Sequence, residues 1–301
     1  MNQESTIKGL LGKTLLKFLT RLSPSLNTRF LYKRVFGKRL DLNHPNTSNE
    51  KVLWLKLNTY YNNPLVTQCA DKYAVREYVK EKGCGDILNE LYGYWTNPDE
   101  IDFDLLPDKF VLKNNYFYHM NLVVTDKSKL DIPATRKLLH EWLKSDGHLV
   151  YSEMQYAAIE KKIIAEKFID TEDGAAPADY KIYCCNGKPL YVMVCIGREQ
   201  NVKPKFYYFD IKGNLQRELT RDGLNALKDF KYDIPAGWDK MIQCAEKLSA
   251  PFPFVRADFY IERGEVIFGE LTFTPAAGLD AGKLPYTDQL LGEQIVLPGV
   301  K

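Results

Sequence analysis

The chain has 301 residues and a mass of 34.7 kDa, and its net charge is +2. A chain of this length buries a substantial core and forms two domains, or one domain with subdomains. With 27% charged and 45% apolar residues, the composition is that of an ordinary soluble protein, and neither a repeat nor a low-complexity segment is present.

The first 40 residues form a basic arm with nine Lys and Arg against one Glu, so the other 261 residues carry a net charge of −6. Apolar residues of the arm fall on one helical stripe, with the basic residues away from it: Ile7, Leu10, Leu11, Leu15, Phe18, Leu19 and Leu22. Such a helix either lies on an anionic membrane surface or packs on protein, and packing is the commoner outcome. Nucleic acid is disfavoured, because the basic cluster is local and no binding motif accompanies it.

Beyond the arm, the pattern predicts helices within 44–56, 71–85, 134–145, 153–160 and 237–249, and strands at 109–115 and 161–170. The turn signals Asn186-Gly187 and Lys212-Gly213 predict two hairpins. Strand pairs that alternate with helices favour an α+β fold with antiparallel sheets.

The six cysteines show no Cys-x-x-Cys spacing and are interpreted as reduced core residues of a cytoplasmic protein: Cys69, Cys84, Cys184, Cys185, Cys195 and Cys244. The sequence shows no secretory signal and no apolar run of membrane-spanning length.

The stretch 256–275, RADFYIERGEVIFGELTFTP, contains two strand-like runs around Gly264. A three-residue loop at 262–264 or 263–265 places Asp258 and Glu270 on one face, whereas a two-residue loop would drive Glu270 into the apolar layer. We therefore expect three residues. The apolar face would then be Ala257, Phe259, Ile261, Ile267, Gly269, Leu271 and Phe273. The other face would carry Arg256, Asp258, Tyr260, Phe268, Glu270 and Thr272.

On that face the two carboxylates would lie roughly 5 to 8 Å apart, and like charges so close need a cation between them. Oxygen ligands beside a Thr hydroxyl suit Mg²⁺ better than Zn²⁺, and Mg²⁺ with few protein ligands implies a bound phosphate. A solvated hairpin face with scattered acids explains the hairpin alone equally well. Lysines at predicted strand edges favour the metal, because together they describe a groove for a polyphosphate: Lys113, Lys167 beside Glu166, and Lys181 near Asp179.

Five motifs, DKYAVREYV, LPDKFVLKNN, DYKIYCCNGKP, FPFVRADFY and GELTFTPAAGLD, resemble in this order the TupA-like branch of the ATP-grasp ligases. That group is associated with teichuronopeptide and capsular polysaccharide biosynthesis. The resemblance runs from about residue 45 to the C-terminus. It implies an ATP-grasp fold, in which two α+β subdomains hold ATP, and a reaction that joins a carboxylate to an amine through an acylphosphate.

The resemblance also assigns roles to residues. ATP binding falls to Lys72, Lys113, Glu166, Lys167, Phe168, Ile169, Asp179 and Lys181, with 166–169 as the adenine hinge. Glu172 or Asp173 would hold the ribose. Mg²⁺ falls to Asp258, Glu270 and Thr272, where many relatives have Asn at the last position. Arg256 and Lys181 are the predicted catalytic residues at the transferring phosphoryl group.

The loop after Lys113 departs from the family pattern of Asn, His and a small Gly/Ser-rich segment, because 114–121 contains no glycine. Its backbone amides would approach phosphate less freely. Either the side chain of Tyr116 or His119 then contacts ATP, or ATP binding is weakened. Ala276 and Ala277, where relatives tend toward Gly or Ser, are a milder change.

These observations predict a ligase that uses ATP and Mg²⁺ to join a uronic acid of a bacterial surface polysaccharide, or of its precursor, to an amino acid or amino sugar. The protein is expected in the cytoplasm, with residues 1–40 at the inner membrane face as a hypothesis. Two alternatives stay open. One is a glycosyltransferase that uses Asp102-Phe103-Asp104 as a metal-binding D-x-D, and the other is a binding protein that has lost catalysis.

The predicted division of the chain has four parts. They are a basic helical extension (1–42), an N-terminal domain (43–105), an ATP-grasp lid subdomain (106–170) and a metal- and acceptor-binding subdomain (171–301).

Overall fold

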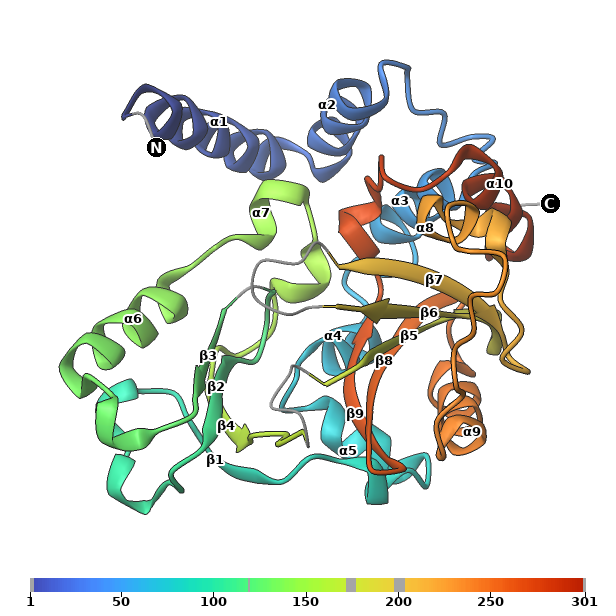
Figure 1. The fold of residues 1–301 in the computed structure, drawn as a ribbon. Coiled ribbons are helices and arrows are strands. Elements are labelled where there is room, and N and C mark those ends of the chain that lie inside the picture. The colour runs from blue at the N-terminus through green and yellow to red at the C-terminus, as the bar shows by residue number, and fades with distance from the viewer. Residues whose placement is uncertain (1–2, 119, 172–176, 198–203, 300–301) are drawn as a thin grey trace.

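Two antiparallel sheets, each with its own hydrophobic layer, organise the chain in the computed structural model, which describes residues 3–118, 120–171, 177–197 and 204–299 (Figure 1). This arrangement confirms the predicted α+β class with antiparallel sheets. Sheet A has the order β1-β4-β2-β3 and sheet B the order β7-β6-β5-β8-β9.

The strands of sheet A come from residues 91–167: β1 (Leu91–Trp95), β2 (Phe110–Asn114), β3 (Asn121–Val124) and β4 (Ile163–Lys167). Phe110 and Leu112 alternate into its core and meet Leu139 and Trp142 of α6 (Ile132–Lys144). The sequence predicted β2 and β4 but neither β1 nor β3. The four-part division of the chain stays a prediction; β1, from its second part, pairs with β4 of its third.

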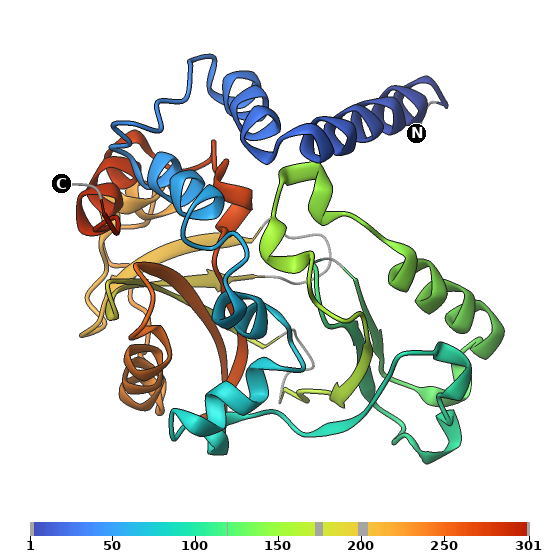
Figure 2. The same ribbon diagram turned by 180° about the vertical axis from the view of Figure 1, so that it is seen from behind.

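The strands of sheet B come from residues 179–272: β5 (Asp179–Cys185), β6 (Lys188–Ile196), β7 (Lys205–Asp210), β8 (Phe254–Glu262) and β9 (Glu265–Thr272). The predicted turn at Asn186-Gly187 joins β5 to β6, and both residues have positive φ. Helix α9 (Trp238–Ser249) packs against β5, β6 and β8 on the side away from sheet A (Figures 1 and 2).

Helices and short 3-10 turns, joined by loops, make up the other described segments. The α-helices not yet named are α1 (Gln3–Leu22), α2 (Pro24–Phe36), α3 (Ser48–Leu57), α4 (Pro64–Ala70), α5 (Val75–Glu81), α7 (His148–Tyr151), α8 (Arg221–Leu224) and α10 (Pro285–Gln294). The 3-10 turns are η1 (Gly85–Ile87), η2 (Pro98–Glu100), η3 (Phe103–Leu105), η4 (Lys127–Lys129), η5 (Met154–Tyr156), η6 (Arg217–Leu219) and η7 (Pro275–Gly278). A capping box starts α3, because the Thr47 hydroxyl accepts from the Glu50 amide while the Glu50 carboxylate accepts from the Thr47 amide.

Two sequence predictions are wrong in detail. The helix expected at 153–160 is only the turn η5, since Ser152 before it is left-handed with φ of 56°. The hairpin expected around Lys212-Gly213 is one strand, β7, and a single bridge between Phe209 and Leu215.

The basic arm forms α1 and α2, which dock on α7 through buried polar contacts (Figure 1). The Asn27 amide donates to Thr20 Oγ1 (2.8 Å) and Ser152 Oγ (3.0 Å), whose hydroxyls lie 2.7 Å apart. Three of the four described residues of the apolar stripe point outward, with Leu15 49%, Phe18 55% and Leu22 62% exposed, whereas Leu19 is half-buried. Packing of these three side chains on the protein body, the commoner outcome, is therefore not observed.

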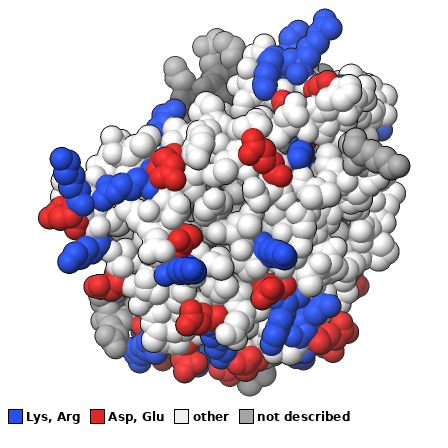
Figure 3. Space-filling model, turned by 90° about the vertical axis from the view of Figure 1, so that its right-hand side faces the viewer, with Lys and Arg blue, Asp and Glu red and all other residues white. Residues whose placement is uncertain are grey.

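Charged side chains of both signs are interspersed over the face of the molecule that carries α8, α9 and α10 (Figure 3). Among the described helices, none combines the length and apolarity needed to cross a bilayer.

Candidate active site

The two predicted metal carboxylates lie on neighbouring strands. In the β8–β9 ladder Asp258 stands directly opposite Glu270, and Arg256 stands opposite Thr272. Directly opposite residues of an antiparallel pair point to the same face of the sheet. The prediction that both carboxylates share one face is confirmed.

The loop between these strands is shorter than predicted. Glu262 pairs with Glu265, which leaves a two-residue loop of Arg263 and Gly264 with φ of 51° and 79°. Two residues with positive φ are the pattern of a type I′ turn, which suits the twist of a hairpin. The expected three-residue loop is wrong.

A β-bulge at Gly269 explains why Glu270 nevertheless stays off the apolar face. Asp258 pairs with Glu270 while its neighbour Phe259 pairs with Phe268, so Gly269 is an extra residue on β9. A Cβ at Gly269 would lie 2.9 Å from the carbonyl oxygen of Asp258, which leaves no room for a side chain. The bulge reverses the alternation once, as the extra loop residue would have done.

Between the turn and the bulge, the predicted faces are therefore reversed. Phe268, expected on the polar face, is 7% exposed and its ring meets that of Phe259 edge-on with centroids 6.0 Å apart. Ile267, expected in the apolar layer, is half-buried and stands opposite Tyr260.

Two cations hold Asp258. Arg256 donates from Nε to Oδ1 (2.7 Å) and from Nη2 to Oδ2 (2.6 Å), and Lys181 Nζ donates to Oδ2 (2.8 Å). Lys181 faces Asp258 because β5 pairs with β8 in that register, and it also donates to Asp179 Oδ1 at 2.9 Å. Burial disfavours a charged Arg256, but the adjacent Asp258 carboxylate raises the Arg256 pKa above its usual value.

Glu270 is held by a third cation. Lys72 Nζ lies 3.5 Å from Glu270 Oε2, and Thr272 Oγ1 donates to Glu270 Oε1 at 3.3 Å. Burial alone would raise the pKa of Glu270, but Lys72, Arg256 and Lys181 lower this pKa to about 2. The three cations therefore favour the ionised form of Glu270.

The predicted residues form one charge-balanced group in which Lys72, Lys181 and Arg256 offset the carboxylates of Asp179, Asp258 and Glu270. Its donors to a metal are oxygen atoms only, which fits Mg²⁺ and not a soft metal. Within the described ranges no three His, Cys, Asp or Glu side chains gather into a metal cage. A Mg²⁺ ion here would take its remaining ligands from phosphate and water.

A second charged group lies on sheet A. Lys113 Nζ donates to Glu166 Oε2 at 2.7 Å, so two of the residues predicted to bind ATP are in contact. Arg76 joins them, with Nη1 3.6 Å from Glu166 Oε1. Sequence reasoning missed Arg76, although it lies inside the motif DKYAVREYV, because its contact spans ninety positions of the chain.

The predicted adenine hinge, 166–169, consists of the last two residues of β4 and the two residues after it. The backbone N–H of Lys167 donates to the Glu90 carbonyl (3.0 Å), and the Lys167 carbonyl accepts from Asn89 Nδ2 (2.8 Å). Phe168 and Ile169 are half-buried. The proposed ribose residues Glu172 and Asp173 lie outside the described residues.

The glycine-free loop after β2 turns its first aromatic ring inward. Tyr116 is fully buried and its hydroxyl donates to the Trp142 carbonyl at 2.6 Å, so the expectation that Tyr116 contacts ATP is wrong. His119 lies outside the described residues. Lys72 connects this loop to Glu270, because its Nζ also donates to the Phe117 carbonyl at 2.9 Å.

The alternative D-x-D motif has a local structural explanation. Asp102 Oδ1 accepts from the Asp104 amide at 3.0 Å and caps the turn η3. This is the ordinary role of Asp before a helical turn.

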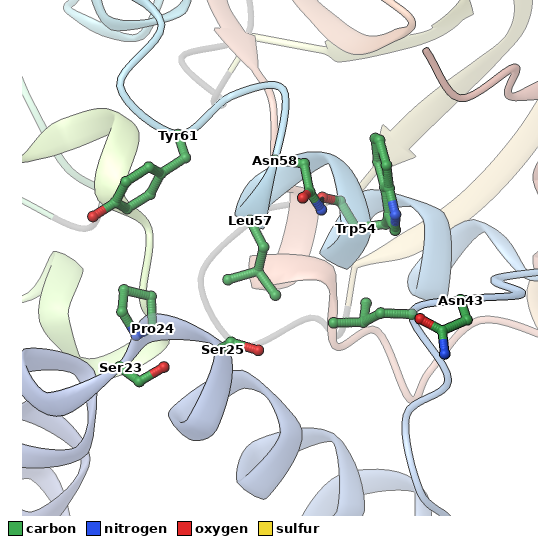
Figure 4. A pocket seen from close by; sticks show the side chains of 9 residues that line it. Ser23, Pro24, Ser25, Asn43, Trp54, Leu57, Asn58 and Tyr61 are labelled. Atoms are coloured by element: carbon green, nitrogen blue, oxygen red, sulfur yellow. Dashed lines mark hydrogen bonds between the residues drawn. The ribbon is translucent and has the colours of Figure 1, made fainter. Parts of the chain in front are cut away.

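A separate cleft of about 370 Å³ opens between the start of α2 and the end of α3 (Figure 4). Trp54, Leu57, Asn58 and Tyr61 line one side of it, and Ser23, Pro24 and Ser25 the other. None of the predicted site residues lies in this cleft.

A family profile described as TupA-like ATPgrasp matches residues 50–296. The chain belongs to the TupA-like ATP-grasp family. This membership confirms both the predicted family and the predicted enzyme class, an ATP-grasp ligase. A search of curated protein sequences finds no match to the chain.

Three solved structures are similar to the chain at low sequence identity. D-alanine–D-alanine ligase from Bacillus anthracis, complexed with ATP, has 14% sequence identity and a TM-score of 0.48, over 84% of this chain and 69% of that one. L-amino acid ligase from Bacillus licheniformis has 13% identity and a TM-score of 0.46, over 82% and 55%. The ATP-grasp ligase PsnB with its minimal precursor has 11% identity and a TM-score of 0.42, over 78% and 62%.

Proposed function

We propose that this TupA-like ATP-grasp protein is a carboxylate-amine ligase that uses ATP and Mg²⁺. The observation that carries the proposal is the group on sheet B, in which Asp258 and Glu270 face each other with Lys72, Lys181 and Arg256 around them. Two acids for a hard metal ion beside three cations for phosphate are what phosphoryl transfer requires.

In the proposed reaction, an oxygen of the substrate carboxylate attacks the γ-phosphorus, and the bond from that phosphorus to the β-phosphate oxygen breaks to release ADP. The amine nitrogen then attacks the acyl carbon, the bond from that carbon to the phosphate oxygen breaks, and one proton passes from nitrogen to the departing phosphate. Arg256 and Lys181 offset the negative charge on the phosphoryl oxygens, and Asp258 keeps both cations in place. Bound Mg²⁺ would neutralise phosphate charge between Asp258 and Glu270, with Thr272 beside them.

The nucleotide would extend from this group toward sheet A. Lys113 and Glu166 with the segment 167–169 are the proposed contacts there, and Asp179 orients Lys181 through its 2.9 Å hydrogen bond. Because Lys72 contacts both Glu270 and the loop after β2, its ammonium group would lie close to a phosphate bound between them.

For the substrates we propose a uronic acid of a surface polysaccharide or its precursor and an amino acid or amino sugar. The resemblance of the five sequence motifs to a group associated with such polysaccharides supports this assignment. The test is ADP formation with ATP, Mg²⁺ and glucuronate or galacturonate in the presence of hydroxylamine, which captures an acylphosphate as a stable hydroxamate. Uronate-dependent hydroxamate is expected from the wild type and not from Arg256→Met. ADP formation that needs no carboxylic acid would refute the ligase.

We further propose that α1 and α2 contact an anionic membrane surface. Leu15, Phe18 and Leu22 are exposed on a helix whose Lys17 and Arg21 pair with Asp146, and exposed apolar residues on a basic helix suit an interface. The triple replacement of these three residues by Ser should abolish binding to vesicles with phosphatidylglycerol and leave the melting temperature unchanged. Equal binding by both proteins would remove the proposal.

A further inference from the structure

A buried polar cluster lies just beyond the strand that carries Glu270. Thr274 continues the alternation of Glu270 and Thr272, two residues past the end of β9. Its hydroxyl donates to Glu153 Oε1 at 2.6 Å and accepts from Gln155 Nε2 at 2.9 Å. Glu153 and Gln155 are each only 1% exposed, so this is an interior site.

The turn that follows Thr274 has an unfavourable backbone. Ala276, Ala277 and Gly278 have φ of 48°, 58° and 75°, three left-handed residues in a row. Left-handed backbone is costly for a residue with a Cβ and persists only where its surroundings hold it.

The turn is fixed at both ends. Glu153 and Gln155 hold Thr274 before it, and Lys56 Nζ lies 3.4 Å from the Ala277 carbonyl within it. Lys56, 1% exposed, also donates to the Tyr151 carbonyl at 2.8 Å. Gly278 is pressed against α3, where an added Cβ would lie 2.7 Å from Leu53. A strained turn so thoroughly held is a feature to be explained by function.

The titratable groups around the cluster come from four segments. Lys56 approaches from α3, Tyr151 from α7, Tyr118 from the loop after β2 and Tyr156 from η5, where Tyr156 also senses Glu270 and Arg256. Burial raises the pKa of Glu153 to about 7, although Thr274 and Lys56 oppose the shift. Burial lowers the pKa of Lys56 to about 8, and Glu153 opposes that shift.

Two acceptor atoms of the cluster, Glu153 Oε2 and Gln155 Oε1, are buried without a hydrogen-bond donor in the described part of the chain. A protonated Glu153 has one O–H to donate and can still accept from Thr274. Ionisation would instead leave a charged, unpaired oxygen in the interior, which is costly enough to draw in water or open the cluster.

We propose that Glu153 is a positioning residue of the ligase. Glu153 acts through Thr274, and together with Lys56, to hold the left-handed turn 276–278 in place beyond the strand that carries Glu270. The inference rests on the proposed function for its effect on turnover but not for its effect on the turn. The cluster has no hydrogen bond to Lys72, Lys181 or Arg256 among the described residues. Its loss therefore lowers turnover and spares nucleotide binding.

The first measurement compares Glu153→Ala, Glu153→Gln and the control Glu141→Ala, which removes a glutamate 63% exposed on α6. Glu153→Ala should lower the rate of uronate-dependent ADP formation about 100-fold, because small misplacements of a site have effects of this size. Binding of a non-hydrolysable ATP analogue should stay within about twofold, a split that mere loss of fold would not produce. Glu153→Gln, which mimics the protonated acid, should restore the rate.

The pH profile gives the readout that a purely structural role would not move. Wild-type turnover should decline as pH rises through about 7, where Glu153 ionises, and Glu153→Gln should lack that decline. An identical profile for both proteins would overturn the proposal, as would equal loss of analogue binding and turnover in Glu153→Ala.

A second measurement is independent of the substrates. Hydrogen exchange of a peptide that covers 270–280 should be at least about tenfold faster in Glu153→Ala than in Glu153→Gln at pH 6.5, because exchange becomes faster as the free energy of local opening falls. If the wild type forms no hydroxamate but the exchange result holds, the proposed reaction fails and the role of Glu153 in the turn stands. If exchange is unchanged, Glu153 does not hold the turn.

Discussion

Deletion of a single residue, Gly269, should be tolerated in the middle of a strand that carries the site. Gly269 is the extra residue of the bulge, and its removal leaves Phe268 opposite Phe259 and Glu270 opposite Asp258. The remaining sequence then alternates without interruption, so every side chain keeps its face. We expect the free energy of unfolding to change by about 1 kcal/mol or less.

Deletion of Ile267 is the matched control, because it shortens the same strand by one residue and also removes the bulge. It would place Gly269 opposite Phe259 and turn Phe268, now 7% exposed, out of the core. Loss of a buried phenylalanine ring costs about 3 to 5 kcal/mol. At about 2 to 4 °C per kcal/mol, the melting temperature should fall by about 6 to 20 °C.

The assay is thermal unfolding followed by circular dichroism, without nucleotide. The register is refuted if deletion of Gly269 lowers the melting temperature as much as deletion of Ile267 does. Equal tolerance of both deletions would show instead that Phe268 does not contribute to the core.

Three further predictions follow from the charged groups. Glu270→Gln should weaken the Mg²⁺-dependent affinity for an ATP analogue, measured by a thermal-shift titration, more than about tenfold. Glu262→Gln, at the turn of the same hairpin, should leave this affinity unchanged, and equal effects of the two variants would contradict the metal assignment. Asp258→Asn should cost about 3 to 5 kcal/mol in denaturant unfolding, because Arg256 would be buried without its carboxylate and Lys181 would keep only Asp179. The exposed Asp170→Asn should cost about 1 kcal/mol or less, and an equal cost for both would contradict the ion-pair assignment. The folded-state pKa of Glu153 is raised from 4.5 to about 7, so the stabilising contribution of its protonated form is complete below pH 4.5 and is lost as pH rises through 7. The free energy of unfolding of the wild type, relative to that of Glu153→Gln, should fall by about 3 kcal/mol over this range. A constant difference would show that Glu153 does not titrate there.

The placement of Asp258 and Glu270 could be predicted because it follows from alternation along two adjacent strands. The same alternation predicted the wrong loop, because a bulge and an extra loop residue both move the following residues of β9 to the other face of the sheet. Gly269 was the available signal, because a glycine inside a strand often marks a bulge or a close backbone approach.

Other features lay beyond local pattern. Glu153 meets Thr274 across more than a hundred residues, and Arg76 meets Glu166 across ninety, so neither contact leaves a mark in spacing. Tyr116 was one of two side chains considered for contact with ATP because its loop lacks glycine, yet its hydroxyl bonds to the Trp142 carbonyl in the interior. The strand β3 was missed because its four residues include an exposed Asn121 and are too short to show periodicity.

Lys72 connects the part of the molecule built on sheet A with the part built on sheet B. Its single ammonium group contacts Glu270 on sheet B and the Phe117 carbonyl on the loop of sheet A, so it works as an ionic latch. At 3.5 Å the two charges are closer together than the screening length of about 10 Å at 0.1 M salt, so dissolved ions weaken the latch only toward 1 M, where that length is about 3 Å. The distance between the two sheets, and with it the molecular envelope seen by X-ray scattering, should therefore change only at salt concentrations near 1 M in the absence of ligand.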